Sequence, residues 1–553
     1  MKAIIITISI LFILSQQSTL KAQQWDWSIG FTNNSTSKHC LESDNDGNSF
    51  FSFSFSHIYT PIIVNTNGET DIFLGKVNNS GTIIWHKGFG GDNQLIYPFP
   101  FGSPFLYNEY INSIEIDNIN SYIYVSGMFY DSCSIDGFTL IATTPTKHQG
   151  FMMKLDFDGN IIWAKEQKAE ITGLALSNDG NLLACGISYT SFVFNSELIG
   201  AGGFIAKFDI AGNEIWAKSK FPMSGEEYGF IPWKIKTDES SIFINCKSDE
   251  YINAETDTIR FDTITYILEP NDPRAAIVCL DMEGNAKWLS VFGGICGNDF
   301  VLDSFSNIYS VGSFLHGTGY FGNDTITTQS TQWNFFLTKH NSLGEIQWVK
   351  HLDGFRSEGF YISNIVDSAF YVIGDCYDSV YFDSDTIPAK KAIGNFVANF
   401  KLDGSFQFVK FTERGAGLAV SQDNNKNAFT IFWGTDLIIG DSVYNIYAGT
   451  YIAKLTHPSS IVEELKTTPA GSLLTIYANP NSGICNITIP EEFEEESELT
   501  LYIYDLNGKL IQESKIELFE ETIRVNIQSQ AKGIYNAVLG NGRKKYYGKI
   551  VFE

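Results

Sequence analysis

Short apolar segments separated by polar turns recur along most of the chain and predict β-strands. In each repeat, an apolar segment leads through a turn such as DFDGN into a second segment, whose aromatic residue lies four positions after the glycine of the turn. Glycine and asparagine accept a positive φ in such turns, so each copy predicts a β-hairpin. The aromatic residues lie 53 to 78 positions apart, at Trp85, Trp163, Trp216, Trp288, Trp348 and Phe408.

A second predicted hairpin precedes each of these hairpins. In the third copy, the sequence ITGLALSNDGNLLACGIS contains two apolar runs split by a turn at 178–181. These runs lack strict alternation, as expected for strands that are buried on both faces. Two hairpins form one four-stranded sheet, and the chain contains seven such units, at about 40–90, 111–168, 171–220, 231–292, 297–352, 360–411 and 415–455. Seven sheets arranged radially form a β-propeller, whose edges are short and protected.

The seventh unit lacks its outer strand. Its third strand is predicted at 451–455, after which TYIAKLTHPSS continues into proline and not into a further strand. A strand without a sheet is predicted at the other end of the chain, in QQWDWSIGF (residues 23–31). We expect this N-terminal strand to complete the seventh sheet, because an unclosed ring exposes a sheet edge. Trp25 and Trp27 are the expected closure residues.

The repeated aromatic residues have two interpretations, an array that stacks sugars or packing between neighbouring sheets. One residue type at one register in every copy is what packing between sheets requires, so we favour packing. The same argument applies to the lysine that follows an aromatic by three positions in most copies. Examples are Phe73 with Lys76 and Tyr451 with Lys454.

Residues 1–22 have the features of a secretory signal peptide. A lysine precedes an apolar segment of about a dozen residues, which is too short to span a membrane as a helix. Ala22 supplies a small residue at the expected cleavage point, so the mature chain is expected to begin at Gln23. No later stretch approaches the roughly 18 apolar residues that a membrane span needs. The protein is therefore expected to be exported.

Composition and charge narrow the chemistry. The content of 44% hydrophobic residues, 14% aromatic residues and 48 glycines agrees with an all-β exported protein. The formal net charge of −26 opposes binding to nucleic acids and anionic membranes. The eight histidines show no HxH or HExxH spacing, and the eight cysteines show no CxxC spacing. The sequence therefore predicts no metal centre built on these residues, and it predicts buried thiols, with one or two disulfides as the alternative.

One segment, 42–47, resembles the first half of a calcium loop because carboxylates occupy alternate positions. Phe53 stands where an EF-hand needs a bidentate glutamate, however. A hairpin turn built on Asp-Gly is the preferred interpretation, with Ca²⁺ as the alternative. We expect no other cofactor.

The candidate ligand surface lies in the loops that join the last strand of one sheet to the first strand of the next. In a propeller these loops gather on one face around the channel, and loops carry function. Aromatic residues with a few arginines suit a glycan or protein epitope; alternatively, the aromatics plug the channel or cover a sheet edge. The candidate residues are Tyr97, Phe105, Tyr107, Tyr228, Trp233, Arg356 and Arg414.

Residues 24–455 are similar to bacterial β-propeller repeat families, whose blades combine D-x-x-G-N-x-Y-x-x-G with F-I-x-K-x-D-x-x-G-x-x-x-W. The segments 303–312 and 204–216 carry this pattern most plainly. The spacing of Asp156, Gly159 and Trp163 also resembles the tryptophan-docking motif of quinoprotein propellers, in which the indole packs between blades. The threonine of that motif is missing, as are adjacent-cysteine and haem motifs, so quinone chemistry is not expected.

A polar linker at 458–470 ends the repeat pattern. Residues 471–553 contain alternating apolar positions and Asn-Gly turns, which predict a small antiparallel, immunoglobulin-like β-sandwich. This segment resembles the type A sorting domain of the bacterial type IX secretion system. The resemblance implies a C-terminal signal that is read by the secretion machinery and removed as the protein is released or attached to the cell surface. The matching residues are Asn479, Pro480, Gly483, Asp505, Gly508, Lys532, Gly533 and Tyr535.

Together these features predict an exported seven-bladed β-propeller, residues 23–457, that is carried out by a cleavable sorting domain. We favour a non-enzymatic protein that binds a glycan or protein partner through its loop face. The alternative is a secreted polysaccharide hydrolase or lyase with carboxylates at the channel mouth, and a third is a purely structural surface module. Two or three carboxylates in one pocket would favour the enzyme, whereas an aromatic shelf without them would favour binding.

Overall fold

The computed structural model describes residues 25–457 and 474–553 with internal gaps. The gaps are 33–37, 56, 59–60, 66–69, 92–108, 144–147, 189, 223–229, 249–256, 262–263, 269–274, 294–295, 316, 329, 331, 353–355, 378–379, 383–384, 388–393, 436, 440–441, 444–448, 491–492, 494–498, 506–509, 517–521 and 541–544. The described chain forms two compact units, one of which spans Trp25–Leu455 while the other contains the described part of 456–553. The described secondary structure consists of β-strands and short turns.

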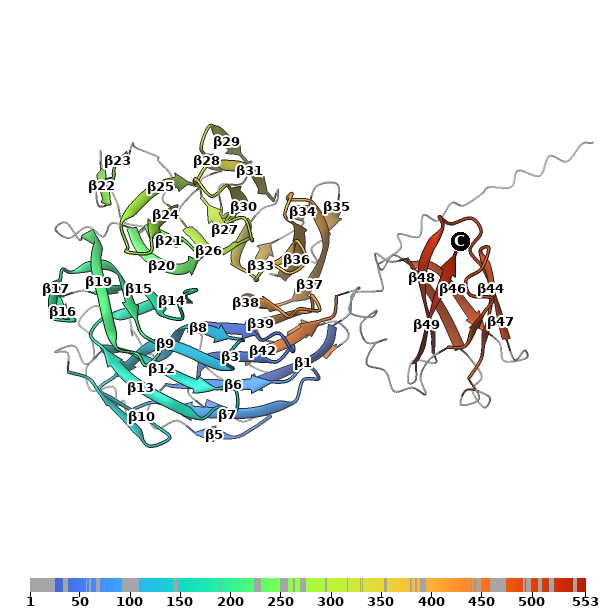
Figure 1. The fold of residues 1–553 in the computed structure, drawn as a ribbon, viewed down its shortest axis with the longest axis horizontal. Helices are drawn as coiled ribbons and strands as arrows, with labels where there is room; N and C mark the ends of the chain where they lie inside the picture. The colour runs from blue at the N-terminus through green and yellow to red at the C-terminus, as the bar shows by residue number, and fades with distance from the viewer. Residues whose placement is uncertain are drawn as a thin grey trace, which may run out of the picture. The chain divides into compact units, whose positions relative to one another are not determined.

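The unit Trp25–Leu455 is an all-β structure whose sheets are arranged around a centre (Figure 1). Within the described residues it contains seven sheets of four or more strands. From the innermost strand outwards these are β2(His39–Ser43)-β3(Ser49–Phe55)-β6(Asp71–Val77)-β7(Ile83–Phe89); β8(Tyr110–Asp117)-β9(Tyr122–Tyr130)-β12(His148–Asp156)-β13(Ile161–Gln167); β14(Glu170–Leu176)-β15(Leu182–Ser188)-β18(Gly202–Phe208)-β19(Glu214–Pro222); β20(Phe230–Thr237)-β21(Ser241–Ser248)-β24(Ala275–Asp281)-β25(Ala286–Phe292); β26(Cys296–Leu302)-β27(Ile308–Phe314)-β30(Asn334–His340)-β31(Ile346–His351); β32(Arg356–Ile362)-β33(Ala369–Tyr377)-β36(Gly394–Lys401)-β37(Phe406–Glu413); and β38(Ala416–Gln422)-β39(Ala428–Gly434)-β42(Gly449–Leu455)-β1(Trp25–Thr32).

A small two-stranded hairpin lies between the second and third strands of every sheet. The sequence pattern does not predict these hairpins, because strands of two to five residues give no readable periodicity. The hairpins are β4(His57–Ile58)-β5(Val64–Asn65), β10(Ser132–Ile135)-β11(Phe138–Ile141), β16(Phe192–Phe194)-β17(Glu197–Ile199), β22(Asp257–Phe261)-β23(Ile264–Leu268), β28(Thr318–Phe321)-β29(Asp324–Thr327), β34(Val380–Phe382)-β35(Asp385–Ile387) and β40(Ile438–Ile439)-β41(Ser442–Val443). The last of them pairs with β37 of the neighbouring sheet.

Burial follows the position of a strand within its sheet. The two middle strands are covered on both faces, as in β3 and β6, where every residue is buried. The outer strand β7 instead alternates between half-buried and exposed residues until Phe89. This difference explains why the apolar runs of the middle strands lack a period of two. The hydrophobic core is accordingly divided into one apolar cluster between each pair of neighbouring sheets, including the pair formed by the last sheet and the first.

Neighbouring sheets are joined by the repeated tryptophans. Each indole ring packs on the turn glycine of the next sheet, so that a Cβ added to Gly81 would lie 2.8 Å from the ring of Trp27. In four of these contacts the indole nitrogen also donates a hydrogen bond to the backbone carbonyl two residues before the glycine, whereas Trp348 Nε1 has no hydrogen-bond partner among the described residues. These bonds run from Trp27 to Asn79 O (2.9 Å), Trp85 to Phe157 O (3.0 Å), Trp163 to Ile210 O (3.2 Å) and Trp288 to Ser342 O (3.1 Å).

The two ends of this unit meet in one sheet. β1 pairs antiparallel with β42, and Trp27 lies opposite Lys454. Trp85 lies opposite Lys76 in the same way, so Trp27 occupies the repeat position that the last copy lacks. Lys454 Nζ bonds both Asp26 Oδ2 (3.0 Å) and Asn79 O (3.3 Å). The innermost strands then contact one another in a complete cycle, from β2 through β8, β14, β20, β26, β32 and β38 back to β2.

The C-terminal unit has its own core between two sheets. One sheet has the order β43(Ile476–Tyr477)-β44(Ile484–Thr488)-β47(Thr522–Asn526), and the other has the order β46(Leu510–Ile516)-β45(Leu499–Tyr504)-β48(Gly533–Gly540)-β49(Lys545–Phe552). Buried side chains of both sheets, such as Ile487, Val525, Leu501 and Ile550, form one cluster. This arrangement makes the unit independent of the propeller core.

Several residues of the predicted sorting motif hold strand ends in the C-terminal unit. Asn479 accepts a hydrogen bond from Val551 N (2.6 Å) and donates one to Lys549 O (2.5 Å). Gly483 has φ +92°, and its N–H donates to Asn481 Oδ1 (2.7 Å). The hydroxyl of Tyr535 donates to Ala531 O. Gly508 lies outside the described residues.

The described residues contain no grouping of three or more His, Cys, Asp or Glu side chains suited to a metal ion. They also contain no apolar helix of the length that crossing a membrane requires. Seven cysteines whose side chains are described are buried free thiols, at positions 40, 133, 185, 246, 279, 376 and 485.

The docking of tryptophan on glycine can be tested with a pair of alanine substitutions. Gly81 and Gly180 have nearly the same φ, +83° and +79°, but only Gly81 touches an indole ring, since nothing lies within 4 Å of a Cβ at Gly180. Both changes incur the cost of a left-handed conformation, about 1–2 kcal/mol. We expect Gly81→Ala to lose a further ~1–3 kcal/mol because Trp27 is displaced. Chemical unfolding followed by tryptophan fluorescence measures both values, and equal losses would contradict the docking role.

Candidate functional site

A cavity of about 230 Å³ lies in the channel at the centre of the propeller. Residues from the innermost strand of every sheet border it, so segments far apart in the sequence build a single wall. The bordering residues are His39, Cys40, Leu41, Glu42, Ser113, Ile114, Glu115, Leu174, Lys234, Ile235, Lys236, Thr237, Asp299, Phe300, Val301, Leu302, Tyr361, Ile362, Asn364, Ala419 and Val420.

A β-bulge recurs in the innermost strands and decides which side chains border this cavity. Register shifts occur at equivalent places in β8, β14, β20, β26, β32 and β38. An extra residue in a strand re-aims the side chains next to it. Lys234, Asp299 and Tyr361 each follow such a bulge directly, and all three border the cavity. The residues at the bulges are Asn112, Thr172, Trp233, Asn298, Phe360 and Leu418.

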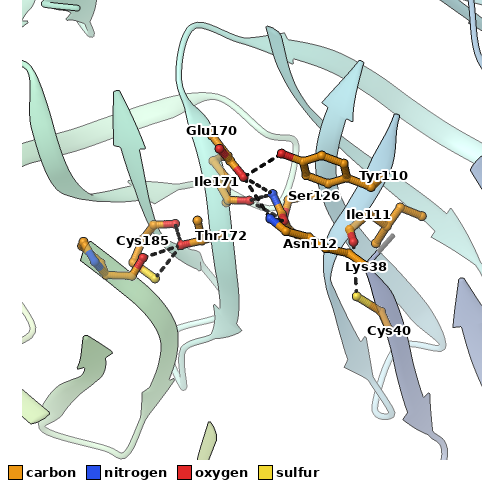
Figure 2. A network of polar contacts seen from close by, with 11 residues as sticks. Lys38, Cys40, Tyr110, Ile111, Asn112, Ser126, Glu170, Ile171, Thr172 and Cys185 are labelled. Carbon is orange, nitrogen blue, oxygen red and sulfur yellow. Dashed lines mark hydrogen bonds and ion pairs between the residues drawn. The ribbon is translucent and has the colours of Figure 1, made fainter. Parts of the chain in front are cut away.

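Three of the bulge residues tie their strand to the next innermost strand. Each side chain donates to the carbonyl that precedes the bulge of the next strand, an arrangement that Figure 2 shows for Asn112 and Ile171. The bonds are Asn112 Nδ2 to Ile171 O (3.0 Å), Thr172 Oγ1 to Pro232 O (2.8 Å) and Asn298 Nδ2 to Gly359 O (2.6 Å). Trp233 occupies the equivalent position in β20 and places an indole ring there instead.

The end of the channel where the innermost strands begin carries a network of polar and aromatic groups, and we call this end the mouth. Glu170 Oε1 accepts hydrogen bonds from Lys38 (3.1 Å), Tyr110 (3.2 Å) and Asn112 (3.2 Å), as Figure 2 shows. Lys38 Nζ also lies 4.3 Å from the centre of the Tyr110 ring and 4.8 Å from that of the Trp233 ring.

A second lysine faces Trp233 at the mouth. Lys247 Nζ lies 4.0 Å from the centre of the indole ring, and such cation–π contacts stabilise by about 0.5–2 kcal/mol. Trp233 is half-buried, so the residue remains partly accessible to solvent. The mouth therefore combines two aromatic rings with ammonium groups.

Three carboxylates border the cavity deeper in the channel, at Glu42, Glu115 and Asp299. Burial raises the pKa of Glu42 to about 7, and the attraction of Lys236 only partly offsets this. Burial also raises the pKa of Asp299 above its ordinary value, although Lys234 and Lys236 act in the opposite direction. These acids are therefore more readily protonated near neutral pH than exposed carboxylates.

Two lysines of β20 stand among these acids. Burial alone would lower the pKa of Lys234 and Lys236, but nearby carboxylates outweigh it and raise both values. The strongest of these interactions is with Asp299 for Lys234 and with Glu115 for Lys236. Lys236 Nζ lies 4.0 Å from Glu115 Oε2. The cavity thus contains permanent positive charge in a protein whose net charge is −26.

Of the predicted ligand-binding residues, the structure places Trp233 at the mouth. Arg414 is exposed in the turn before β38 and has φ +64°. Arg356 begins β32. The other four, Tyr97, Phe105, Tyr107 and Tyr228, lie outside the described residues.

The charged residues of the cavity were not predicted. The sequence pattern indicates a role for Glu42 only in the calcium-like segment 42–47. Lys234 and Lys236 come just after Trp233, which is the predicted ligand-binding residue. A signal existed in the pattern WKIKT at 233–237, where charged residues alternate within a strand that its neighbours predict to be buried. Only the ring of strands reveals that these positions face Glu42, more than 190 residues away in the sequence.

The calcium-like segment forms a hairpin turn around Asp44. Its Oδ1 accepts hydrogen bonds from the backbone N–H groups of Asp46 (3.0 Å) and Asn48 (2.8 Å). Its Oδ2 accepts a hydrogen bond from the side-chain amide of Asn48 (2.7 Å). The same arrangement recurs in other turns, for example at Asp156 with Asn160. Both carboxylate oxygens of Asp44 therefore serve the turn, which is the Asx geometry expected of such a sequence.

Glu42 gives a prediction for the pH dependence of stability. Its pKa is about 7 in the folded protein and 4.5 ordinarily, so the folded state binds its proton more tightly, and stability from this group falls as pH rises from about 4.5 to about 7. Glu42→Gln cannot ionise and should therefore unfold at a higher temperature than the wild type at pH 8, with no difference at pH 4. Calorimetry measures both, with the exposed Glu166→Gln as a control that should show no such change. A wild type more stable than Glu42→Gln at pH 8 would contradict the assignment.

Comparison with known proteins identifies the C-terminal unit. Residues 475–553 match the family described as secretion system C-terminal sorting domain. No curated protein matches the chain. Among solved structures, the chain is similar to the Dos1 propeller, with 9% identity and a TM-score of 0.41 over 79% of this chain and 96% of that one. A member of the DUF4221 family from Bacteroides vulgatus has 10% identity and a TM-score of 0.30 over 78% and 97% of the two chains.

The sorting domain decides the destination of the protein, because such a domain is the export signal of the type IX secretion system. The cyclic arrangement of four-stranded sheets in Trp25–Leu455 is that of a β-propeller. The chain is a β-propeller protein with a type IX secretion sorting domain at its C-terminus, and it is secreted to the outer cell surface or the extracellular space.

Proposed function

We propose that this protein is a seven-bladed β-propeller that binds a glycan or protein partner at the mouth of its channel. The observation that carries the proposal is Trp233, a half-buried indole at the mouth with Lys38 and Lys247 against its ring. Indole rings supply large contact areas at little entropic cost and are enriched among the residues that dominate binding energy. The sorting domain is removed after it has been read by the secretion machinery.

The architecture supports this assignment. Seven sheets whose innermost strands contact each other in a cycle are the expected basis of seven blades. Two antiparallel sheets around one core support an immunoglobulin-like sandwich for residues 471–553. We assign 23–457 to the propeller, 458–470 to the linker and 1–22 to a signal peptide.

The charges at the mouth favour a ligand with hydroxyl or carboxylate groups. Lys38 and Lys247 donate hydrogen bonds, while Glu170 accepts them and Asn112 does both. Glu170 already accepts three hydrogen bonds, so its carboxylate is held in place and orients the groups around it. A sugar ring or a polar aromatic side chain of a partner matches such a combination of flat apolar and polar groups.

Trp233→Ala tests binding at the mouth. We expect a loss of at least about tenfold in affinity for the bound glycan or protein, as is typical of a central aromatic anchor. Glycan-array screening followed by calorimetry with the best ligand measures this. Phe305→Ala is the matched control, because Phe305 is 80% exposed in the turn between β26 and β27, away from the mouth. A ligand whose affinity is unchanged by Trp233→Ala would refute the proposal.

A second candidate is a polysaccharide hydrolase or lyase, which the carboxylates of the cavity favour. Glu42, with a pKa of about 7, holds a proton near neutral pH and could act as general acid beside Glu115 or Asp299. Because the innermost strands surround the cavity, such an enzyme would act only on a chain end. Incubation with the polysaccharides found on the array should then release products, and Glu42→Gln should slow release by roughly 10²–10⁴-fold. Absence of products eliminates the enzyme and leaves binding unaffected.

A further inference from the structure

Two oppositely charged side chains border the cavity without a hydrogen bond or ion pair to any described residue; one of them, Lys234, has its Nζ 5.7 Å from the centre of the Tyr361 ring. Asp299 accepts the N–H groups of Phe300 (3.0 Å) and Ile362 (3.3 Å). Glu115 accepts the N–H of Leu176 (3.0 Å) and faces Lys236. The Glu42 carboxylate and the Lys234 ammonium, by contrast, make no hydrogen bond or ion pair with any residue that the structure describes.

Glu42 and Lys234 lie where a charge without a hydrogen bond or ion pair is costly. Both residues are only partly exposed, and the loss of solvation is large enough to move the pKa of Glu42 to about 7. A charge in such surroundings is costly unless an opposite charge or a hydrogen-bonding group is supplied. Glu42 and Lys234 do not satisfy one another, because no ion pair within 4.0 Å joins them in the described structure. Both residues border the same cavity.

The lining of the cavity restricts the chemistry of an occupant. An anion alone would meet three carboxylates, and a cation alone would meet Lys234 and Lys236. The described residues contain no group of side chains suited to a metal ion. A volume of about 230 Å³ is below the ~300–1,000 Å³ of pockets for drug-sized ligands. The occupant must therefore be small and carry both charges.

The cavity is also open to solvent. Asn364 borders it and is exposed, just beyond the end of β32. A small molecule can therefore reach the charged groups without separating the sheets. A polymer cannot pass sideways through the wall, because the innermost strands contact each other all the way around.

We propose that the central cavity binds a small zwitterion, of which a free α-amino acid is the chemical class. Its ammonium group binds Glu42, and its carboxylate binds Lys234. Asp299 and Glu115 are held by backbone N–H groups, so they keep negative potential in the cavity without having to move, and Asp299 acts most strongly on Lys234. Lys236 balances part of that charge. This site is separate from the glycan- or protein-binding mouth, and it does not depend on binding there.

Calorimetric titration of the full chain with glycine, L-serine and L-glutamine tests the proposal. Acetate, methylamine and D-glucose serve as probes that carry only the anion, only the cation or neither charge. We expect saturable binding of at least one amino acid and none of the three other probes. Saturable binding of acetate, methylamine or glucose at comparable affinity, or no binding of any of the three amino acids, overturns the proposal.

Variants at the two unpaired groups complete the test. Glu42→Gln and Lys234→Met should each weaken amino-acid binding by roughly tenfold or more, because each removes one of the paired charges. Glu166→Gln and Lys168→Met, at exposed positions around the end of β13, are matched controls and should bind like the wild type. Circular dichroism and unfolding temperature establish that each variant is folded. Folded Glu42→Gln and Lys234→Met proteins that bind amino acids as the wild type does would place the ligand elsewhere and overturn the proposal.

Discussion

In six of the sheets the tryptophan of the outer strand packs on the glycine turn of the next sheet, and the rest of the propeller depends on this contact. The turn needs a glycine for two reasons, illustrated at Gly81: its φ is positive, and its missing side chain leaves the space that Trp27 fills. The indole N–H then satisfies a backbone carbonyl at the edge of the neighbouring sheet. Apolar burial, backbone geometry and hydrogen bonding thus act at one point, and the point is repeated from sheet to sheet.

Closure of the ring follows from the same contact. Because β1 joins β42 in the register that places Trp27 opposite Lys454, the N-terminus supplies the tryptophan that the last repeat does not encode. The apolar cluster between the last sheet and the first, which includes Phe31 and Phe51, then resembles those between sequential sheets. Closure also forces the innermost strands together around an axis. Their bulges carry Lys234 and Asp299 into a common volume, so the charged cavity is a consequence of the ring and not of any local motif.

The sorting domain and the propeller that carries the proposed binding site are different parts of the chain, each with its own hydrophobic core. In the C-terminal unit, Asn479 fixes the final strand β49 through two hydrogen bonds. This contact gives the NPNSG segment a structural role beside its role in the sorting motif. The propeller in turn carries the aromatic mouth and the charged cavity, two sites of different chemistry along a single channel.

The sequence by itself determined the repeats, the hairpins, the sorting tail and the pairing of the first strand of the propeller with its last strand. These features depend on local turn chemistry and on one aromatic at a fixed distance from a glycine, so the printed order of residues is sufficient to find them. It also predicted Trp233 as a candidate ligand-binding residue, through the composition of the loop before it. Only the tertiary structure decided that Glu42, Lys234 and Asp299 share one cavity, because they lie on different strands that no short pattern connects. The physical reason is the β-bulge: one extra residue changes which side chains face the channel, and its effect appears only when the strands are assembled.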